Sequence, residues 1–181
     1  MKKEDIYREL AGRFSLRKKK FIADNYLLVE VQAEDLLDFL SFCKEKLEFG
    51  HFTSITCVDY PKQNSFSLSY NLFSYQNRVL ITVKIYIERN SGEFQSVSGI
   101  YYPARFFERD IYEMFGINFI GNEYQGKFIL DEWEGRPPMR KDFDTRRYVD
   151  EHFKWRIYQP QWAKDLGIKP EDLEGKDLEL L

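Results

Sequence analysis

Apolar residues recur at helical spacing in the first part of the chain. Residues 33–47 carry a stripe that repeats every three or four positions, formed by Leu36, Leu40, Cys43 and Leu47 and widened by Leu37 and Phe39. This spacing predicts a helix that buries one face. Residues 4–13 predict a shorter helix, and residues 21–31 predict two strands joined at Asp24-Asn25.

The middle of the chain changes to strict alternation of apolar and polar residues. One run places Phe66, Leu68, Tyr70 and Leu72 on one face, and a second run does the same with Val79, Ile81, Val83, Ile85 and Ile87. Together with residues 52–60, these runs predict three strands. The segments PKQN and YQN between them are short enough only for hairpins, so we expect a meander.

Strands that are apolar on one face only are typical of an antiparallel sheet that helices cover on one side. The sequence therefore predicts an α+β fold of two layers, with a mainly antiparallel, mixed sheet built on the meander and covered by helices. The chain of 181 residues suits one core domain, which we place at residues 1–130.

A strongly amphipathic helix is predicted for residues 104–115, directly after Pro103. Its apolar arc consists of Ala104, Phe107, Ile111, Met114 and Phe115. We expect Gly116 to end the helix in the left-handed conformation, which glycine adopts without strain.

Several residues of this helix depart from a simple amphipathic pattern. Glu108 falls at the edge of the apolar arc, and Phe106 falls among polar residues. Arg105, Arg109 and Glu113 lie on the opposite face, where Arg109 and Glu113 are spaced to form an ion pair. A carboxylate beside a core needs hydrogen-bond donors, and an exposed aromatic side chain suggests an interaction site.

The composition changes after about residue 130. From Asp131 to Pro160 the aliphatic residues are Val149 and Ile157, whereas the aromatic ones are Trp133, Phe143, Tyr148, Phe153, Trp155 and Tyr158. Such a segment is too poor in aliphatic residues to form its own core. Because Arg, Trp and Tyr anchor protein interfaces, we predict that residues 131–181 form an extended arm that binds another protein.

Charge and composition exclude several classes of protein. The formal net charge of −3 gives no basic field that would attract nucleic acid. No apolar stretch is long enough to span a membrane, and the acidic residues near the start argue against a signal peptide. Cys43 and Cys57 lack C-x-x-C spacing, so buried free thiols in a reducing cytoplasm are expected, although a disulfide is possible.

The sequence contains no ligand set or catalytic motif that we recognise. His51 and His152 are the only histidines, and with two unclustered cysteines they do not form a zinc, haem or iron–sulfur site. We therefore expect this chain to bind no cofactor or metal and to contain no catalytic residue.

One glycine loop resembles a phosphate-binding loop. Residues 121–128, GNEYQGKF, match the pattern except that Phe128 stands where Ser or Thr would hold Mg²⁺. The residues that follow are also unlike a helix, whose N-terminus a nucleotide would require. We interpret the segment as a loop with Lys127 in solvent or paired with a partner, and a stand-alone nucleotide-binding protein is a remote alternative.

The stretch ERDIYEMFGINFIGN, followed by FIL, WEG and PMRKDF, resembles the 30-kDa (C-type) subunit of respiratory complex I. The same family occurs in membrane-bound hydrogenases and ferredoxin-linked complexes. The matching residues are Glu108, Arg109, Asp110, Glu113, Met114, Phe115, Gly116, Ile117, Lys127, Ile129, Leu130 and the run Arg140-Lys141-Asp142-Phe143. Gly121-Asn122-Glu123 departs from the family's usual Gly-His-Pro.

The resemblance implies a non-catalytic structural subunit in the peripheral arm of a membrane-associated, ion-translocating oxidoreductase. Such a subunit docks against a hydrogenase-like large subunit of the 49-kDa type, on the cytoplasmic side of the membrane. Iron–sulfur clusters, with or without a nickel–iron centre, would reside in partner subunits. The departures leave open a complex I-like enzyme, using NADH or ferredoxin, or a membrane-bound nickel–iron hydrogenase. A binding module unrelated to electron transfer is a weaker alternative.

The resemblance and the sequence pattern together suggest residues that bind the partner. These are Phe106, Glu108, Arg109, Asp110, Glu113, Gly116, Trp133, Arg140, Lys141, Asp142, Phe143 and Trp155. We expect Glu108 to accept hydrogen bonds from backbone or arginine groups, and Phe106 to act as an interface anchor. The alternative is that the candidates within residues 104–116 merely stabilise the helix and its ends.

Overall fold

The structure is a computed structural model that describes residues 1–152 and 161–169. The chain divides into two compact units, Met1–Phe143 and Asp144–Leu181. The first unit extends past residue 130, where the sequence predicted the end of the core domain. Residues 139–141 hydrogen-bond to Asp59 and to the backbone of Met114 and Phe115. An extended partner-binding arm at residues 131–181 stays a prediction.

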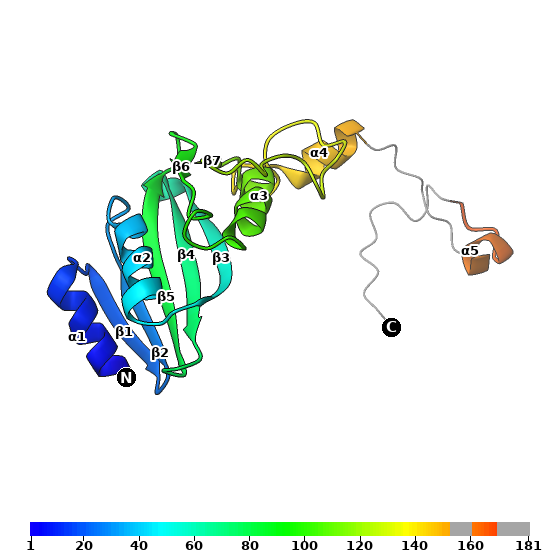
Figure 1. Cartoon of the computed structure of the whole chain (residues 1–181). Coiled ribbons are helices and arrows are strands. Elements are labelled where there is room, and N and C mark those ends of the chain that lie inside the picture. Colours follow the sequence, from blue (N-terminus) through cyan, green and yellow to red (C-terminus); the bar gives the residue numbers. More distant parts are fainter. Residues whose placement is uncertain (153–160, 170–181) are drawn as a thin grey trace. The chain divides into compact units, whose positions relative to one another are not determined.

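A five-stranded sheet in the order β1-β2-β5-β4-β3 forms the centre of the first unit (Figure 1). Its strands are β1 (Lys18–Ala23), β2 (Tyr26–Glu30), β3 (His51–Tyr60), β4 (Ser65–Ser74) and β5 (Val79–Glu88). The strands β3, β4 and β5 form the predicted antiparallel meander, whereas β2 pairs with β5 in parallel. The prediction of a mixed, mainly antiparallel sheet is confirmed.

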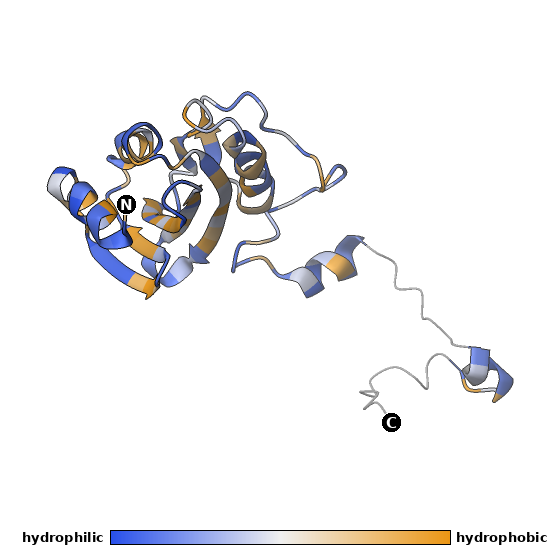
Figure 2. Ribbon diagram, turned by 60° about the horizontal axis from the view of Figure 1, so that its bottom comes forward, coloured by the Kyte–Doolittle hydropathy of each residue, from blue (hydrophilic) through white to orange (hydrophobic). Residues whose placement is uncertain are grey.

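Three helices pack with this sheet around one core: α1 (Lys3–Arg13), α2 (Leu36–Lys46) and α3 (Ala104–Phe115). The short 3₁₀ helix η1 (Pro61–Gln63) connects β3 to β4. Phe66, Leu68, Tyr70 and Leu72 are all buried, as their alternation predicted. The edge strand β1 is exposed throughout and hydrophilic over its lysines (Figure 2), which protects the sheet edge from further pairing.

A second sheet of two short parallel strands lies next to α3. It consists of β6 (Glu93–Gln95) and β7 (Asn118–Ile120). The sequence did not predict these strands, because three residues are too few to show a period of two. The pair matters for the site, since it brings Ser96 and Asn122 to the same side of α3.

The second unit contains α4 (Thr145–His152) and α5 (Gln161–Asp165). No residue of α4 is buried, and its exposed ion pair joins Arg147 to Glu151 at 2.8 Å. The predicted interface residue Trp155 lies outside the described residues. A partner-binding role for this segment stays a prediction.

Candidate functional site

Glu108, in the middle of α3, is completely buried rather than placed at the edge of the core. Its carboxylate accepts hydrogen bonds from the Ser96 hydroxyl at 2.7 Å, the Val97 backbone N–H at 2.8 Å and the Asn122 side-chain amide at 2.9 Å. The expected backbone donor is present, while the other donors are Ser96 and Asn122 instead of an arginine. Burial raises the pKa of Glu108, and the three hydrogen bonds oppose that rise without cancelling it.

Glu113 is also buried, and its predicted ion pair with Arg109 is wrong. Its carboxylate accepts the backbone N–H groups of Phe128 at 2.8 Å, Ile129 at 3.0 Å and Leu130 at 2.6 Å. Burial alone would raise the pKa of Glu113, but these N–H groups lower it below its usual value. The three N–H groups of residues 128–130 form an anion-binding turn, and the Glu113 carboxylate of α3 is the anion that occupies it.

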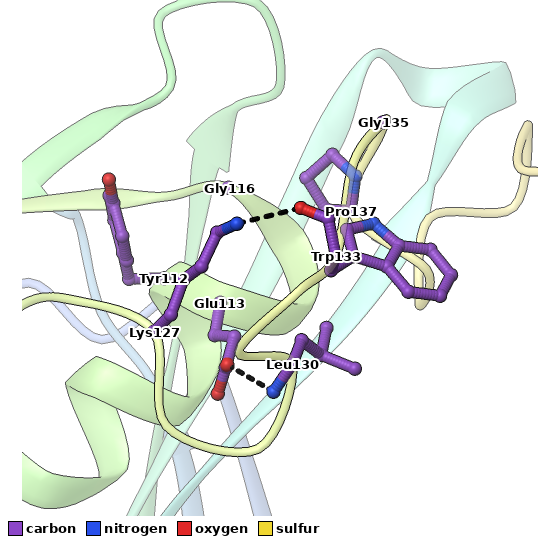
Figure 3. A pocket seen from close by; sticks show the side chains of 8 residues that line it. All are labelled: Tyr112, Glu113, Gly116, Lys127, Leu130, Trp133, Gly135 and Pro137. Carbon is purple, nitrogen blue, oxygen red and sulfur yellow. Dashed lines mark hydrogen bonds between the residues drawn. The ribbon is translucent and has the colours of Figure 1, made fainter.

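The loop after this turn and the end of α3 line an open pocket of about 330 Å³ (Figure 3). The lining residues are Tyr112, Glu113, Gly116, Lys127, Leu130, Trp133, Gly135 and Pro137. Lys127 donates through Nζ to the carbonyl oxygens of Trp133 at 2.8 Å and Asp131 at 3.3 Å, so it stabilises the loop. No helix follows Phe128 before Thr145. The segment thus lacks the helix N-terminus of a phosphate-binding loop, and the N–H of Phe128 at its end already donates to Glu113.

Gly116 ends α3 in the left-handed conformation, with φ of 71° and ψ of 35°, as predicted. A Cβ atom at this position would stand 2.8 Å from Pro137 Cγ and 3.3 Å from Arg140 Nη2. Arg140 donates from Nε to the carbonyl oxygen of Phe115 at 2.6 Å and so caps the helix. The glycine is required both by the backbone conformation and by the close approach of residues 137–140.

The run Arg140-Lys141-Asp142-Phe143, which belongs to the family motif, is fixed to the sheet by a network of charged groups. Arg89 donates to Asp59 from Nε at 2.8 Å and from Nη2 at 3.1 Å, and to Asp142 at 2.6 Å. The backbone N–H of Lys141 donates to Asp59 at 2.8 Å. Burial alone would raise the pKa of Asp59, but the hydrogen bonds from Arg89 and Lys141 lower it. This network holds residues 141–142 against the end of β3.

The aromatic residues of the same segment contact each other. The rings of Trp133 and Phe143 have centroids 5.3 Å apart, and Trp133 donates from Nε1 to the carbonyl oxygen of Arg136 at 3.0 Å. Among the predicted interface residues, Glu108, Glu113, Gly116, Trp133, Arg140, Asp142 and Phe143 therefore make contacts within this chain, as does the backbone of Lys141.

The exposed side of α3 carries arginines stacked on aromatic rings. The guanidinium carbon of Arg105 lies 3.6 Å from the ring centroid of Tyr102, 3.9 Å from that of Tyr124 and 4.6 Å from that of Phe106. Sequence analysis placed Arg105 on this face but did not select it, because Tyr124 lies in a loop far along the chain.

Arg109 forms a second stack on the same side, with its guanidinium carbon 4.1 Å from the ring centroid of Phe128. Asp110 is next to it on the helix. Burial raises the pKa of Asp110, and the positive charge of Arg109 opposes this. Of the predicted site residues, Phe106 and Arg109 therefore belong to an outer surface, whereas Glu108 and Glu113 belong to the interior.

Metal ligands and membrane spans were also searched for in the described residues. Residues 1–152 and 161–169 contain no group of three His, Cys, Asp or Glu side chains that could hold a metal ion. Cys43 and Cys57 are free thiols. None of the helices in this part of the chain combines the length and apolarity needed to cross a bilayer.

Comparison with known proteins gives consistent matches. A model of the family described as "Respiratory-chain NADH dehydrogenase, 30 Kd subunit" matches residues 29–149. The C-type subunit of NADH-quinone oxidoreductase from Rickettsia felis is 32% identical over 165 residues, covering 87% of this chain and 79% of that protein. The C-type subunit of F(420)H(2) dehydrogenase from Methanosarcina mazei is 32% identical over 114 residues, covering 62% of this chain and 70% of the relative.

Solved structures share the fold. A chain in the structure of the membrane-bound sulfane sulfur reductase, an archaeal respiratory membrane complex, superposes with a TM-score of 0.78 at 32% identity. The match covers 88% of this chain and 96% of that one. A trypsin-resistant fragment of Nqo5 gives a TM-score of 0.57 at 22% identity, covering 67% of this chain and 98% of the fragment. The latter similarity supports the fold alone.

Proposed function

The chain belongs to the family of the 30-kDa subunit of respiratory-chain NADH dehydrogenase, and from this membership we propose that it is a structural subunit of a membrane-associated respiratory oxidoreductase. The observation that carries the proposal is the extent of the match, which covers 88% of this chain and 96% of a subunit in a respiratory membrane complex. The similarity thus concerns a whole subunit instead of one shared motif.

We assign the subunit to the peripheral arm of that complex, on the cytoplasmic side of the membrane. Its partner would be a hydrogenase-like large subunit of the 49-kDa type, and adjoining subunits would hold the iron–sulfur clusters. A rigid subunit docked there would keep its neighbours, and hence their clusters, in fixed positions. Rigidity is supported by the buried carboxylates of Glu108 and Glu113, which hold segments far apart in the sequence to α3.

The same structural role in a membrane-bound nickel–iron hydrogenase is the second candidate. Its support is limited to the similarity to a sulfane sulfur reductase and to a subunit of an F(420)H(2) dehydrogenase, two relatives that are named neither for NADH oxidation nor as hydrogenases. The two candidates differ in the metal content of the partners and not in the role of this chain.

Purification of the assembled complex tests both candidates. The chain would be tagged in its native host, extracted from membranes in mild detergent and purified, and the co-purifying subunits would be identified by mass spectrometry. We expect a hydrogenase-like large subunit and bound iron, and stoichiometric nickel would select the hydrogenase. Recovery of the chain by itself, without iron-containing subunits, would contradict the proposal.

Calorimetry tests the remote alternative of a nucleotide-binding protein. We expect no saturable heat when Mg-ATP is titrated into the purified chain, because the N–H groups of residues 128–130 are occupied by Glu113. Saturable binding that is lost in a Lys127→Ala variant would favour the alternative instead.

A further inference from the structure

We propose that the outer side of α3 is a docking surface for an acidic segment of a neighbouring protein subunit, with Arg105 at its centre. The surface, which we call the arginine–aromatic patch, consists of Tyr102, Arg105, Phe106, Arg109, Tyr124 and Phe128. The inference rests on the proposed function in one respect, namely that the neighbour belongs to the respiratory complex.

The aromatic side chains of the patch are unusually exposed for a folded domain. The exposed fractions are 63% for Tyr102, 44% for Phe106, 49% for Tyr124 and 64% for Phe128. They come from α3, from the turn before it and from the loop after β7, so the patch exists only in the folded chain. Adjacent exposed aromatic residues are typical of interaction surfaces, where Tyr, Trp and Arg contribute most of the binding energy.

The arginines of the patch differ from those that stabilise the fold. Arg89 donates to Asp59 and Asp142, and Arg140 donates to a carbonyl oxygen. By contrast, the Nε atoms of Arg105 and Arg109 are covered and have no hydrogen-bond partner among the described residues. Stacking holds each guanidinium in one plane in advance, which lowers the entropy cost of binding a carboxylate.

The electrostatic surroundings favour Arg105 as the centre. The charge of Arg109 is partly balanced, because it acts on the carboxylates of Asp110 and Glu113. Within the described part of the chain, Arg105 has no carboxylate in ion-pair contact, and its neighbours are the rings of Tyr102 and Tyr124. A planar, always-charged group without a counterion is suited to a partner's Asp or Glu.

A protein segment fits this surface better than a nucleic acid. The chain carries a net charge of −3 and the patch holds only two arginines, so it offers a polyanion little net attraction. The faces of Tyr102 and Tyr124 are also covered by the guanidinium of Arg105 and are less available for stacking on bases. An acidic segment with apolar side chains would satisfy the arginines and cover Phe106 and Phe128 together.

Site-specific crosslinking in the assembled complex identifies the occupant directly. A photoreactive phenylalanine would replace Phe106, with the same group at Tyr75 as the control, because Tyr75 is 70% exposed and lies in the β4–β5 turn. We expect Phe106 to crosslink to a peptide of a neighbouring subunit that contains Asp or Glu within a few residues of the attachment point. A crosslink to nucleic acid, or no crosslink from an intact complex, would overturn the proposal.

Substitution of Arg105 measures its contribution. We expect Arg105→Ala to weaken retention of the neighbouring subunits about tenfold during salt washes of the tagged complex, as for loss of an interface anchor. Arg105→Lys keeps the charge but loses the planar stack, and we expect an intermediate effect. The matched control is Arg13→Ala, because Arg13 stacks on Phe14 and Phe42 away from this patch.

Thermal unfolding and the recovery of partner subunits distinguish a misfolded variant, a wrong docking surface and a wrong proposed function. Thermal unfolding of the purified chain should be nearly the same for Arg105→Ala and the wild type, which excludes misfolding as the cause. If the wild type assembles and Arg105→Ala is retained equally well, the docking surface is wrong while the proposed function stands. If the tagged wild-type chain recovers no oxidoreductase subunits, the proposed function is wrong, and the docking surface, which rests on it, is wrong too.

Discussion

Arg89 and Asp59 form a two-point ion pair in which the Asp59 side chain is fully buried and the Arg89 side chain is 13% exposed. Asp59 is near the end of β3, and Arg89 follows β5 directly. Because Arg89 also reaches Asp142, one guanidinium joins two strands of the sheet to the segment that follows α3. The family motif at residues 140–143 is thus anchored to the sheet at the surface of the first unit.

Removing Arg89 is expected to destabilise the protein strongly. Arg89→Ala leaves the carboxylate of Asp59 buried without its cation, and such a change typically costs about 3–5 kcal/mol of unfolding free energy. Urea unfolding of the purified chain measures this loss. Arg147→Ala is the control, because the pair of Arg147 with Glu151 is exposed, and we expect almost no change there. Similar midpoints for both variants would contradict the prediction.

Glu108→Gln is expected to destabilise the protein less as the pH rises. The folded-state pKa of Glu108 is raised above its unfolded value of about 4.3, so its contribution is fully present below that pH and decreases as pH rises through the folded pKa. Glutamine does not titrate, and the difference from the wild type should therefore shrink as the pH rises from about 4 through the raised folded-state pKa of Glu108. Urea unfolding across this range checks the slope.

Glu113→Gln should show the opposite dependence on pH. The folded-state pKa of Glu113 is lowered, so its contribution is present above an unfolded pKa of about 4.3 and is lost as pH falls through the folded value. The destabilisation should therefore be larger at neutral pH than in acid. Because Glu108→Gln and Glu113→Gln change the same kind of group on the same helix, each serves as the control for the other. If the destabilisation by the two substitutions changed with pH in the same direction, the opposite pKa shifts assigned to Glu108 and Glu113 would be wrong.

Glu113→Gln should also loosen the turn at residues 128–130 locally. We expect faster hydrogen exchange at the amides of Phe128, Ile129 and Leu130 in Glu113→Gln, because a weaker acceptor holds them. Exposed Glu123 lies in the same connection, and Glu123→Gln should leave these three amides unchanged. Exchange measured by NMR resolves the individual amides.

We expect Gly116→Ala to lower the free energy of unfolding by more than the strain of a left-handed alanine alone. The backbone strain is about 1–2 kcal/mol, and the added Cβ would also displace Pro137, whose Cγ atom would stand 2.8 Å away. Displacement of Pro137 should loosen the cap that Arg140 places on the helix. Gly126→Ala is the matched control, because nothing lies within 4 Å of the position where its Cβ would be. Thermal unfolding of both variants distinguishes them, and equal midpoints would contradict the argument.

Much of the fold could be predicted from local patterns. The alternation around Phe66 and Tyr70 identified the buried face of β4, because a strand exposes successive side chains to opposite faces. Gly116 was likewise identified as a helix end, since the chemistry of a glycine C-cap is contained in a few neighbouring residues. The short strands β6 and β7 escaped prediction because each is only three residues long.

The site was predicted less well, because its contacts join residues that are far apart in the sequence. The expected pairing of Arg109 with Glu113 assumed that a helix residue interacts within its own helix, yet Glu113 binds a loop that begins at Phe128. Asp59 and Arg89 were missed entirely, because neither has a signal in its own segment. Glu108 was recognised as unusual, but its donors Ser96 and Asn122 could not be.

The sequence by itself determined the order of the longer elements up to α3, the buried faces and the family, because period, turn chemistry and motif spacing are properties of neighbouring residues. Only the tertiary structure decided which charged groups lie inside and which outside. A buried carboxylate is stable only where donors from distant segments meet it, as they meet Glu108 and Glu113. For the same reason, the stack of Arg105 on Tyr124 exists only after the loop has folded onto α3.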